Sequence, residues 1–481
     1  MIVLKFGGTS VGTLERVRDA ASIIEAQAKP RAVVVSAASG VTNMLLDAAR
    51  LSAAGDMPAT HVIVEAIEAR HHEIIGGIQS DEERKVARSI VDALHGELRR
   101  DLDEARIASS TSPALSDQIV SIGERSMSVM MAATLRDRGT PAAHVFAHDV
   151  IATDDRHGNA RPDRHRTREQ AEERVRPLLD GGLTVIMTGF IGGAPDGSIT
   201  TLGRGGSDCS ATLLGAALMA EEVQIWTDVP GVLTADPRVV KNTRVVPQIS
   251  FDEAQELAHF GAKVLHPRTI RPAVALDIPV RILSTFAPQE PGTLITRESS
   301  NQQLKAVSVM SGLQLLTVDV PELEDLSGAA SKVFGTLYED RVEVVLVSQA
   351  SSRRRMTYLI DGTSSGGCDP VLERLADSLQ DFEAIVGCTP DVAIVAAVGH
   401  GAAEQPKALS QLLAALGREA IPILASSQQA SNAALVAAIP SQFAERALQA
   451  VHREFIRPQA ESGRLRRRRR SQLMGEAMRV G

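Results

Sequence analysis

Gly203-Arg204-Gly205-Gly206-Ser207-Asp208 is the stretch that decides the fold, because it lies between an apolar run, Thr184–Thr188, and a helix-like run, Cys209–Ala220. A glycine-rich turn that leads into a helix presents unpaired backbone N–H groups and the positive helix end to an anion. The arginine can bind a carboxylate or a phosphate, and the aspartate can accept from an ammonium group or help to hold a metal ion. The stretch therefore predicts a site that handles phosphate together with a charged small molecule.

Short apolar, β-branched runs recur on both sides of this turn, and stretches with helical spacing separate them. Strands that are apolar on both faces and alternate with helices indicate a parallel sheet covered on both sides. Open sheets of this kind bind ligands beyond the carboxyl ends of their strands, so we expect the polar segments that follow the strands to meet at one crevice. The strand runs are Ile2–Phe6, Ala32–Ser36, Thr184–Thr188, Val223–Thr227 and Val280–Leu283, and the polar segments are Gly7–Ser10, Ser36–Asn43, Gly189–Gly193 and Thr227-Asp228.

A different organisation begins after the proline- and glycine-containing stretch 285–301. Two copies of a strand–loop–helix–strand–turn–strand pattern, over 315–360 and 392–439, predict paired small domains of ferredoxin-like type. Such a pair commonly serves as a ligand sensor, and a dimerisation module is the alternative. In the second copy we expect a strand at Ile421–Leu424. The predicted domains are a catalytic domain at 1–288, a linker at 289–304, a tandem regulatory region at 305–460 and an arginine-rich tail at 461–481.

Length, charge and composition exclude several classes of protein. A chain of 481 residues is too long for one ordinary core, and its net charge of −8 gives no global reason to bind nucleic acid or a membrane. The three cysteines lack CxxC spacing, which argues against a cysteine zinc site. The first residues lack the pattern of a signal peptide, and prolines interrupt the longest uncharged run, Ala420–Ala444. We expect a cytoplasmic enzyme with a small-molecule partner.

The arginine-rich C-terminal stretch and the pair His71-His72 suggest binding sites, but each has a simpler interpretation. Arg464 and Arg466–Arg470 could bind phosphate backbones, but an acidic chain without interleaved aromatic residues favours a solvated, disordered tail. The pair His71-His72 lies in a charged helical stretch, where exposed histidines are commoner than ligands, and no third ligand has suitable spacing. We therefore predict no protein residues as metal ligands.

Lys5-Phe6-Gly7-Gly8-Thr9-Ser10 places a lysine at a strand end immediately before two glycines. The Walker pattern has its lysine after the glycines, so a different phosphate-binding turn is implied. Taken alone, the motif is also compatible with a surface lysine beside a tight turn.

Seven motifs follow one another along the first part of the chain: Lys5–Ser10, Ser36–Asn43, Gly123-Glu124, Gly203–Asp208, Trp226–Gly231, Asp236-Pro237-Arg238 and Phe260–Pro267. This ordered set resembles the aspartate kinases of the amino acid kinase family, and the two repeated units resemble the tandem ACT domains of that family. The resemblance covers residues 1 to about 285 and implies a three-layer αβα sandwich with a mainly parallel sheet, followed by two ferredoxin-like ACT domains. It also implies ATP-dependent phosphorylation of L-aspartate, with Mg²⁺, in the biosynthesis of lysine, threonine and methionine.

The residue types suit this reaction. Transfer of a γ-phosphoryl group to a carboxylate brings two anions together, so catalysis rests on positioning and on cationic screening. A β-carboxylate with an ordinary pKa of about 3.9 is already ionised at neutral pH, so the nucleophile needs no general base. We expect Lys5 to neutralise charge in the transition state and Asp208 to orient Lys5 or Mg²⁺, while the resemblance implies that Lys263 approaches the nucleotide phosphates.

The resemblance further implies that Arg204 holds the α-carboxylate of the substrate and Glu124 its ammonium group. Leu233 departs from the family, which often has an aromatic residue there, so stacking on the nucleotide is open at this position. Ser36, Thr42 and Ser207 complete the expected substrate side, and Gly7, Gly8, Thr227, Asp228, Leu233 and Arg238 complete the expected ATP side.

The ACT-like pair implies feedback by an end-product amino acid, threonine or lysine, and a homo-oligomer formed through these domains. Gly328 at a helix entry and Gln349 in a turn resemble effector-pocket positions. Two alternatives stay open: a kinase of another small carboxylate, such as glutamate or acetylglutamate, and a catalytically silent amino-acid sensor. Glu124 argues against an N-acylated substrate, which offers no ammonium group.

Overall fold

The computed structural model describes residues 1–262, 267–298, 304–320, 326–350, 355–362, 368–402, 407–428 and 432–456. The chain forms two compact units. The first comprises Met1–Val232, Val245–Ala254 and Lys263–Ser299, and the second comprises Leu233–Arg244, Gln255–Ala262 and Ser300–Gly481. In the described residues, no helix combines the length and the apolar character needed to span a membrane.

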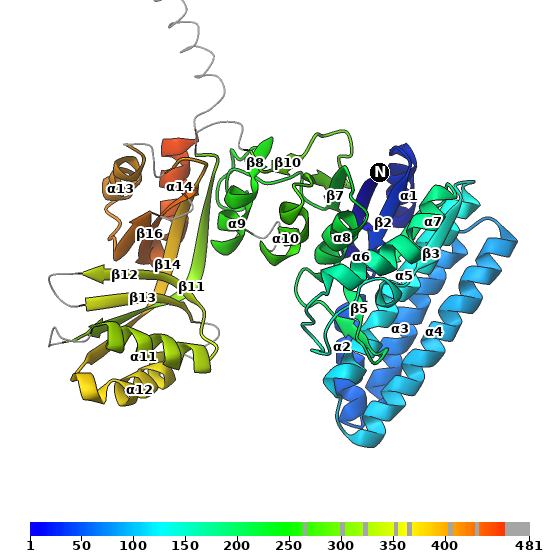
Figure 1. The fold of residues 1–481 in the computed structure, drawn as a ribbon, viewed down its shortest axis with the longest axis horizontal. Coiled ribbons are helices and arrows are strands. Elements are labelled where there is room, and N and C mark those ends of the chain that lie inside the picture. The colour runs from blue at the N-terminus through cyan, green and yellow to red at the C-terminus, as the bar shows by residue number, and fades with distance from the viewer. Residues whose placement is uncertain are drawn as a thin grey trace, which may run out of the picture. The chain divides into compact units, whose positions relative to one another are not determined.

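An eight-stranded sheet forms the centre of the first unit, in the order β3-β4-β2-β1-β7-β9-β10-β8 (Figure 1). The pairings from β3 to β9 are all parallel, and only β10 runs antiparallel to β9. The predicted parallel sheet is therefore confirmed. The strands are β1 Ile2–Phe6, β2 Arg31–Val35, β3 Ala142–Val145, β4 Thr184–Thr188, β7 Glu222–Thr227, β8 Gln248–Ser250, β9 Val280–Ser284 and β10 Thr293–Thr296.

The central strand β1 shows how the sheet divides its side chains. Successive residues of a strand point to opposite faces. Leu4 and Phe6 are completely buried in the core cluster that contains the helices α1 and α5. Lys5 points to the other face, where it reaches helix α8. Helices therefore cover both faces of the sheet: α1 Leu14–Ala26 and α5 Pro113–Asp137 on one, and α8 Gly206–Ala217 on the other.

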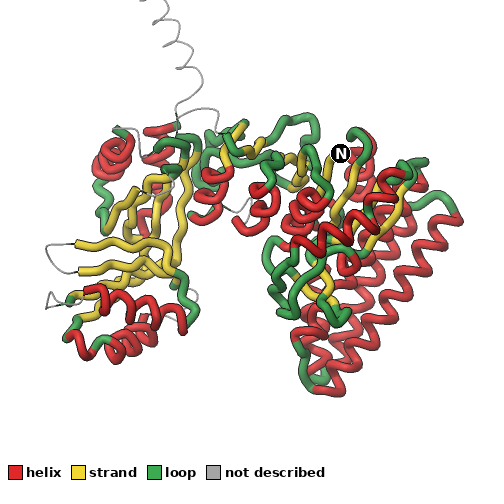
Figure 2. The backbone as a smooth tube through the Cα atoms, viewed as in Figure 1, coloured by secondary structure: helices red, strands yellow, loops and turns green. Residues whose placement is uncertain are grey.

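The stretch Met44–Pro113 forms a helical excursion whose long helices stand out as red tubes in Figure 2. Three helices start at a side-chain cap: Asp56 accepts from Ala59 N, Ser80 accepts from Glu83 N, and Ser112 accepts from Leu115 N at the start of α5. The first helix of the excursion starts at Gly40, without a side-chain cap. The helices of the excursion are α2 Val41–Ala53, α3 Met57–Gly76 and α4 Asp81–Ala108.

The remaining elements of the first unit border the sheet or extend from it. The short strands β5 and β6 form a separate hairpin, and β6 leads into the glycine-rich turn. The bounds of the remaining elements are β5 Ile191–Gly193, β6 Ile199–Thr201, α6 Arg164–Arg174, α7 Arg176–Asp180, α10 Pro267–Ala275, and the short 3₁₀ turns Gly8–Ser10 and Ala147–Asp149. Helix α9, Phe251–His259, follows β8.

A six-stranded antiparallel sheet forms the second unit, in the order β12-β13-β11-β14-β16-β15. Two strand–helix–strand–strand–helix repeats build it, and β11 pairs with β14 to join them. Two ferredoxin-like repeats are therefore present, as predicted. They consist of β11 Ala306–Asp319, α11 Leu326–Glu339, β12 Val344–Ala350, β13 Arg355–Asp361 and α12 Cys368–Ser378, and of β14 Ile385–Val398, α13 Ala408–Arg418, β15 Ala425–Gln428, β16 Ala434–Pro440 and α14 Ala444–Phe455.

Three local expectations differ from the structure. The strand predicted at Ile421–Leu424 is wrong, because the pairing strand β15 begins at Ala425. Gln349 lies in the edge strand β12 rather than in a turn. The segment 289–304, expected to be a linker, contains β10, which pairs with β8 and β9 in the first sheet. Short runs of this kind lack a clear period, so neighbours in space decide their state.

Candidate active site

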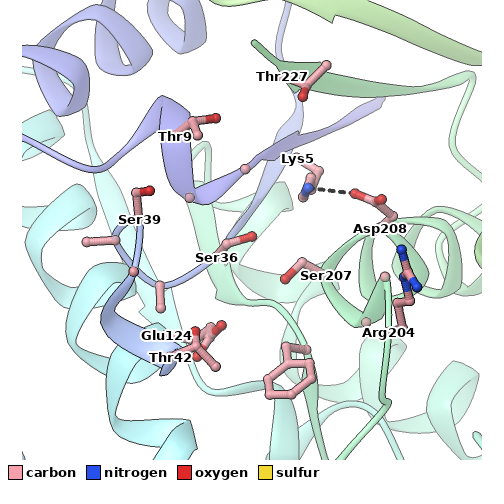
Figure 3. A pocket seen from close by; sticks show the side chains of 18 of the residues that line it. Lys5, Thr9, Ser36, Ser39, Thr42, Glu124, Arg204, Ser207, Asp208 and Thr227 are labelled. Carbon is pink, nitrogen blue, oxygen red and sulfur yellow. Dashed lines mark ion pairs between the residues drawn. The ribbon is translucent and has the colours of Figure 1, made fainter. Parts of the chain in front are cut away.

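The carboxyl ends of β1, β2 and β7 meet at a pocket of about 750 Å³ in the first unit (Figure 3). Parallel neighbours place their carboxyl ends at one edge of a sheet, so the segments after each strand share this space. The pocket is lined by Lys5, Gly7, Gly8, Thr9, Ser36, Ala37, Ala38, Ser39, Gly40, Thr42, Asn43, Glu124, Phe190, Gly203, Arg204, Gly205, Gly206, Ser207, Asp208, Thr227 and Asp228.

A lysine–aspartate ion pair lies on one side of the pocket. Lys5 Nζ is 2.6 Å from Asp208 Oδ1, and the exposed fractions of the two side chains are 11% and 15%. Lys5 comes from β1 and Asp208 from the first turn of α8, so the pair joins two segments 203 positions apart (208 minus 5). A cation fixed in a poorly solvated pocket interacts more strongly with a bound anion than it would in water.

The glycine-rich turn leads directly into α8 and directs its N-terminus at the pocket. Gly205 has a φ of +73° at the N-cap, in the left-handed region that favours glycine. Gly206, Ser207 and Asp208 form the first turn, and all three line the pocket. The free N–H groups and the positive dipole end of this helix therefore offer a place for an anion.

The carboxyl group of Glu124 lies in the pocket wall, beside Thr42 in Figure 3. Glu124 is 3% exposed, and among the described residues its Oε2 has no hydrogen-bond partner. Burial raises the pKa of Glu124 to about 8, and a hydrogen bond from the backbone of Ala37 offsets only part of this rise. An unpaired buried carboxylate is costly, so this group is suited to a cationic partner.

Gly123 allows helix α5 to approach the loop that follows β2 closely. A Cβ atom at Gly123 would lie 2.7 Å from the Cβ of Ala37, which is too near for two carbon atoms. The missing side chain lets α5 pack directly against the loop that follows β2. The adjacent Glu124 reaches the pocket for this reason.

The pocket brings together most of the predicted site residues. In the view of Figure 3, Ser36 and Ser207 lie between the Lys5–Asp208 pair and Glu124. The remaining predicted members of the lining are Gly7, Gly8, Thr42, Arg204, Thr227 and Asp228.

The other predicted residues either fall outside the described residues or belong to the second unit. Lys263 falls outside the described residues, as does the arginine tail. Leu233 and Arg238 belong to the second unit, where the guanidinium of Arg238 pairs with Asp236. Gly328, in the first turn of α11, and Gln349 also belong to the second unit. The roles of these residues remain predictions.

Asp117 was missed at the sequence level. It is 3% exposed, and its Oδ2 accepts from Gly158 N at 2.9 Å and from Thr201 N at 3.0 Å. Its Oδ1 accepts from Thr201 Oγ1 at 2.7 Å, and Oδ2 also lies 3.1 Å from His157 Nδ1. Asp117 thus ties the loop at 157–158 to the strand end that leads into the glycine-rich turn. Its position seven residues before Glu124, on the same face of α5, was the available signal.

Replacing Asp117 with asparagine is expected to raise the KM for the substrate predicted to bind at Arg204 by about 10- to 100-fold, because several charge-assisted hydrogen bonds are lost. The KM for the nucleotide should change much less, which a merely structural defect would not produce. Steady-state kinetics with each substrate varied in turn measures the difference. Asp103→Asn, at an exposed position of α4, is the matched control. An equal rise in both KM values would contradict this positioning role.

The expectation that His71 and His72 are exposed is wrong for His71, which is completely buried. Its Nδ1 lies 2.9 Å from His95 Nε2 on the neighbouring helix α4. Burial lowers the pKa of His71 to about 3, so the ring is neutral. Two long helices packed side by side bring these residues together, and spacing along one helix could not reveal it.

Acidic residues of the loop before α6 have structural partners. Asp154 Oδ1 accepts from Arg161 N at 2.8 Å and from Arg156 N at 3.3 Å. Asp163 caps α6 by accepting from His165 N and Arg166 N. Through these hydrogen bonds to backbone N–H groups, the two carboxylates stabilise the conformation of the loop and the start of α6.

Comparison with known protein families gives two matches. A model described as the amino acid kinase family matches residues 1–284, and a model described as an ACT domain matches residues 395–455.

Among curated proteins, the chain is similar to "Lysine-sensitive aspartokinase 3" of Escherichia coli (strain K12), with 34% identity over 455 residues, 94% of this chain and 98% of the relative. It is 32% identical to "Bifunctional aspartokinase/homoserine dehydrogenase" of Haemophilus influenzae over 95% of this chain and 56% of the relative. The chain thus spans about half the length of that bifunctional relative.

Among solved structures, E. coli aspartokinase III in complex with aspartate and ADP, described as the R-state, has a TM-score of 0.81 and 34% identity, covering 95% of this chain and 100% of that one. The complex of the same enzyme with lysine and aspartate, described as the T-state, has a TM-score of 0.76 with the same identity and coverage.

Proposed function

Because the chain belongs to the amino acid kinase family, as an aspartokinase, we propose that its pocket transfers the γ-phosphoryl group of ATP to the β-carboxylate of L-aspartate. A carboxylate oxygen forms a bond to the γ-phosphorus, the bond to the bridging β,γ-oxygen breaks, and ADP and 4-phospho-L-aspartate leave. The observation that carries the proposal is that Lys5, Arg204 and Glu124, from three separate segments, line one pocket.

Lys5 and the first turn of α8 supply the positive potential for the transfer. Both reactants are anions, so a fixed ammonium group and free backbone N–H groups lower the barrier by screening their repulsion. Asp208 holds Lys5 in place through the 2.6 Å ion pair. The β-carboxylate of the substrate is already ionised at neutral pH and needs no general base, so Asp208 acts as an orienting group.

Arg204 and Glu124 recognise the two charged groups of the amino acid. Arg204 is exposed at the pocket and offers a guanidinium fork to the α-carboxylate. Glu124 offers a buried carboxylate to the ammonium group, whose positive charge would favour the ionised form of Glu124. Ser36, Thr42 and Ser207 are placed to help fix the acceptor carboxylate, and Thr227 and Asp228 belong to the nucleotide side, with Gly7 and Gly8.

Mg²⁺ fits this pocket, because the carboxylate of Asp208 lies beside the helix end proposed for the phosphates, and Mg²⁺ is usually held by one or two carboxylates together with substrate phosphates. Asp208 is the residue that would hold it. When bound, the ion neutralises charge on the phosphate oxygens.

A hydroxamate assay tests the proposed substrate. Aspartate, glutamate and acetylglutamate are each supplied with ATP and Mg²⁺, and the acyl phosphate formed is trapped with hydroxylamine. We expect turnover with aspartate at least about 100-fold above acetylglutamate, because the N-acylated substrate leaves the buried charge of Glu124 unpaired, which costs several kcal/mol. Glutamate keeps the ammonium group but places its side-chain carboxylate one methylene further out, so we expect slower turnover with it as well. A preference for acetylglutamate would overturn the assignment, and no turnover with any of the three would favour the silent sensor.

For the second unit, we propose that the region 305–460, which follows a catalytic region 1–288, is an amino-acid sensor. Gly328 and Gln349 would lie near the bound effector. The similarity to the lysine-sensitive E. coli relative favours lysine over threonine. Association of ACT domains into a homo-oligomer is part of this proposal. Adding either amino acid to the same assay distinguishes the two effectors.

A further inference from the structure

Helices α3 and α4 bring together a cluster of nitrogen and oxygen donors that does not line the catalytic pocket. His72 on α3 faces Asp92 and His95 on α4, and one ligand atom from each of the three lies within 4.8 Å of the other two. His72 Nε2 is 2.6 Å from Asp92 Oδ1. The ring of His72 meets the ring of His95 edge-on, with centroids 5.7 Å apart. None of the three residues lines the pocket described above.

We infer that His72, Asp92 and His95 form a binding site for a divalent transition-metal ion, Zn²⁺ by preference, which bridges α3 and α4. Two imidazoles and one carboxylate are ligands that Zn²⁺ accepts, and a fourth position remains for water. Donor atoms around a tetrahedral Zn²⁺ lie about 3.4 Å apart, given bond lengths of about 2.0–2.1 Å. The present separations, which reach at most 4.8 Å, therefore need to close by at most about 1.4 Å.

The positions of the ligands along the helices favour this site. Asp92 and His95 are three residues apart, so their side chains lie on one face of α4. The side chains of His72 and Asp92 are 30% and 48% exposed, which gives an ion and its waters access. His95 is 3% exposed and anchors the inner side of the cluster.

A second layer of contact holds His95 in position. The Nε2 of His95 lies 2.9 Å from Nδ1 of the completely buried His71, and the two rings are stacked with centroids 5.2 Å apart. Metal-binding imidazoles usually use their second nitrogen in a hydrogen bond that fixes the ring. This contact leaves Nδ1 of His95 as the atom that would bind the ion.

Neighbouring charges do not block the site. Arg88 Nε lies 3.8 Å from Asp92 Oδ2, and Arg88 is 58% exposed, so this ion pair is weak and easily displaced. Glu68, one turn before His72, is already bound to Arg99 at 2.7 Å. The carboxylate of Asp92 is therefore available to an ion.

Metal titration of the full-length protein tests the inference. After removal of metal with a chelator, the protein is titrated with Zn²⁺ by calorimetry, in buffer without nucleotide or Mg²⁺. We expect saturable binding of one ion per chain with a Kd in the micromolar range or tighter, and a higher Tm in the presence of Zn²⁺, because binding to the folded state alone stabilises it.

Variants of the partly exposed ligands keep the test independent of core packing. His72→Gln and Asp92→Asn should each weaken binding at least about tenfold, and the double variant should abolish both binding and the rise in Tm. His61→Gln on α3 and Asp103→Asn on α4, both exposed, are matched controls that should bind as the unmodified chain does.

Cobalt adds a readout that detects direct coordination. Co²⁺ in a site with nitrogen ligands and low coordination number absorbs in the visible range, and this band should be present in the unmodified chain and in the controls but absent in the double variant. Binding that is equally strong in the double variant, or no saturable binding below about 100 μM, would overturn the inference.

Discussion

Replacing Lys5 with methionine is expected to lower kcat by about 10³-fold or more, the range found when a single cationic group is removed from a phosphoryl-transfer site. Methionine keeps an unbranched stem in the pocket and removes only the charge. Lys5 lies 2.6 Å from Asp208 at the end of β1, where it faces the first turn of α8. Steady-state turnover of aspartate at saturating ATP measures the effect.

Two further variants separate charge stabilisation from a packing defect. Lys29→Met removes an exposed lysine before β2 and should leave kcat unchanged. Asp208→Asn should lower kcat less than Lys5→Met and leave the pH profile unshifted, because Asp208 orients Lys5 and is not a base. If the double variant Lys5→Met/Asp208→Asn recovers activity, Lys5 serves only to neutralise Asp208, and the proposed role of Lys5 is wrong.

Replacing Glu124 with glutamine is expected to lower kcat/KM for L-aspartate by about 100-fold or more, because the ammonium group of the substrate loses a buried counter-charge. Glutamine has the same shape and can still accept from the backbone of Ala37, so the pocket should keep its form. In the unmodified chain, kcat/KM should rise with pH towards the pKa of Glu124, about 8, because the ionised form binds the ammonium group. The variant should lack this rise.

When both proteins are free of ligand, Glu124→Gln should be more stable than the unmodified chain. The pKa of Glu124 is raised from 4.5 to about 8, so between these values the folded state holds a proton that the unfolded state releases. Stability therefore falls as pH rises through this window, by about 3 kcal/mol at pH 7. The Tm difference between Glu124→Gln and the unmodified chain should grow from pH 5 to pH 8.

A constant Tm difference over this range would contradict the raised pKa. An unchanged kcat/KM in Glu124→Gln would contradict ammonium binding. Glu65→Gln, at an exposed position of α3, is the control for both measurements.

The strand ends of the parallel sheet could be predicted because each buried strand is followed by glycine or a small polar residue. Ser36 after β2 and Thr227 at the end of β7 were recognised from this pattern, and both line the pocket. Asp117 was missed because its partners, Gly158 and Thr201, are 41 and 84 positions away. The histidine cluster was missed for the same reason, since His71 and His95 belong to different helices.

The sequence by itself determined the alternation of strands and helices, the paired ferredoxin-like repeats and the glycine-rich turn before α8, because these features depend on periodicity and on backbone freedom over a few residues. Only the tertiary structure decided which side chains are buried and which of them contact one another. Glu124 has its raised pKa because α5 packs against the loop after β2, and Lys5 meets Asp208 because β1 and α8 share one face of the sheet. Burial and electrostatic interactions depend on distances across the fold, and local sequence patterns do not specify them.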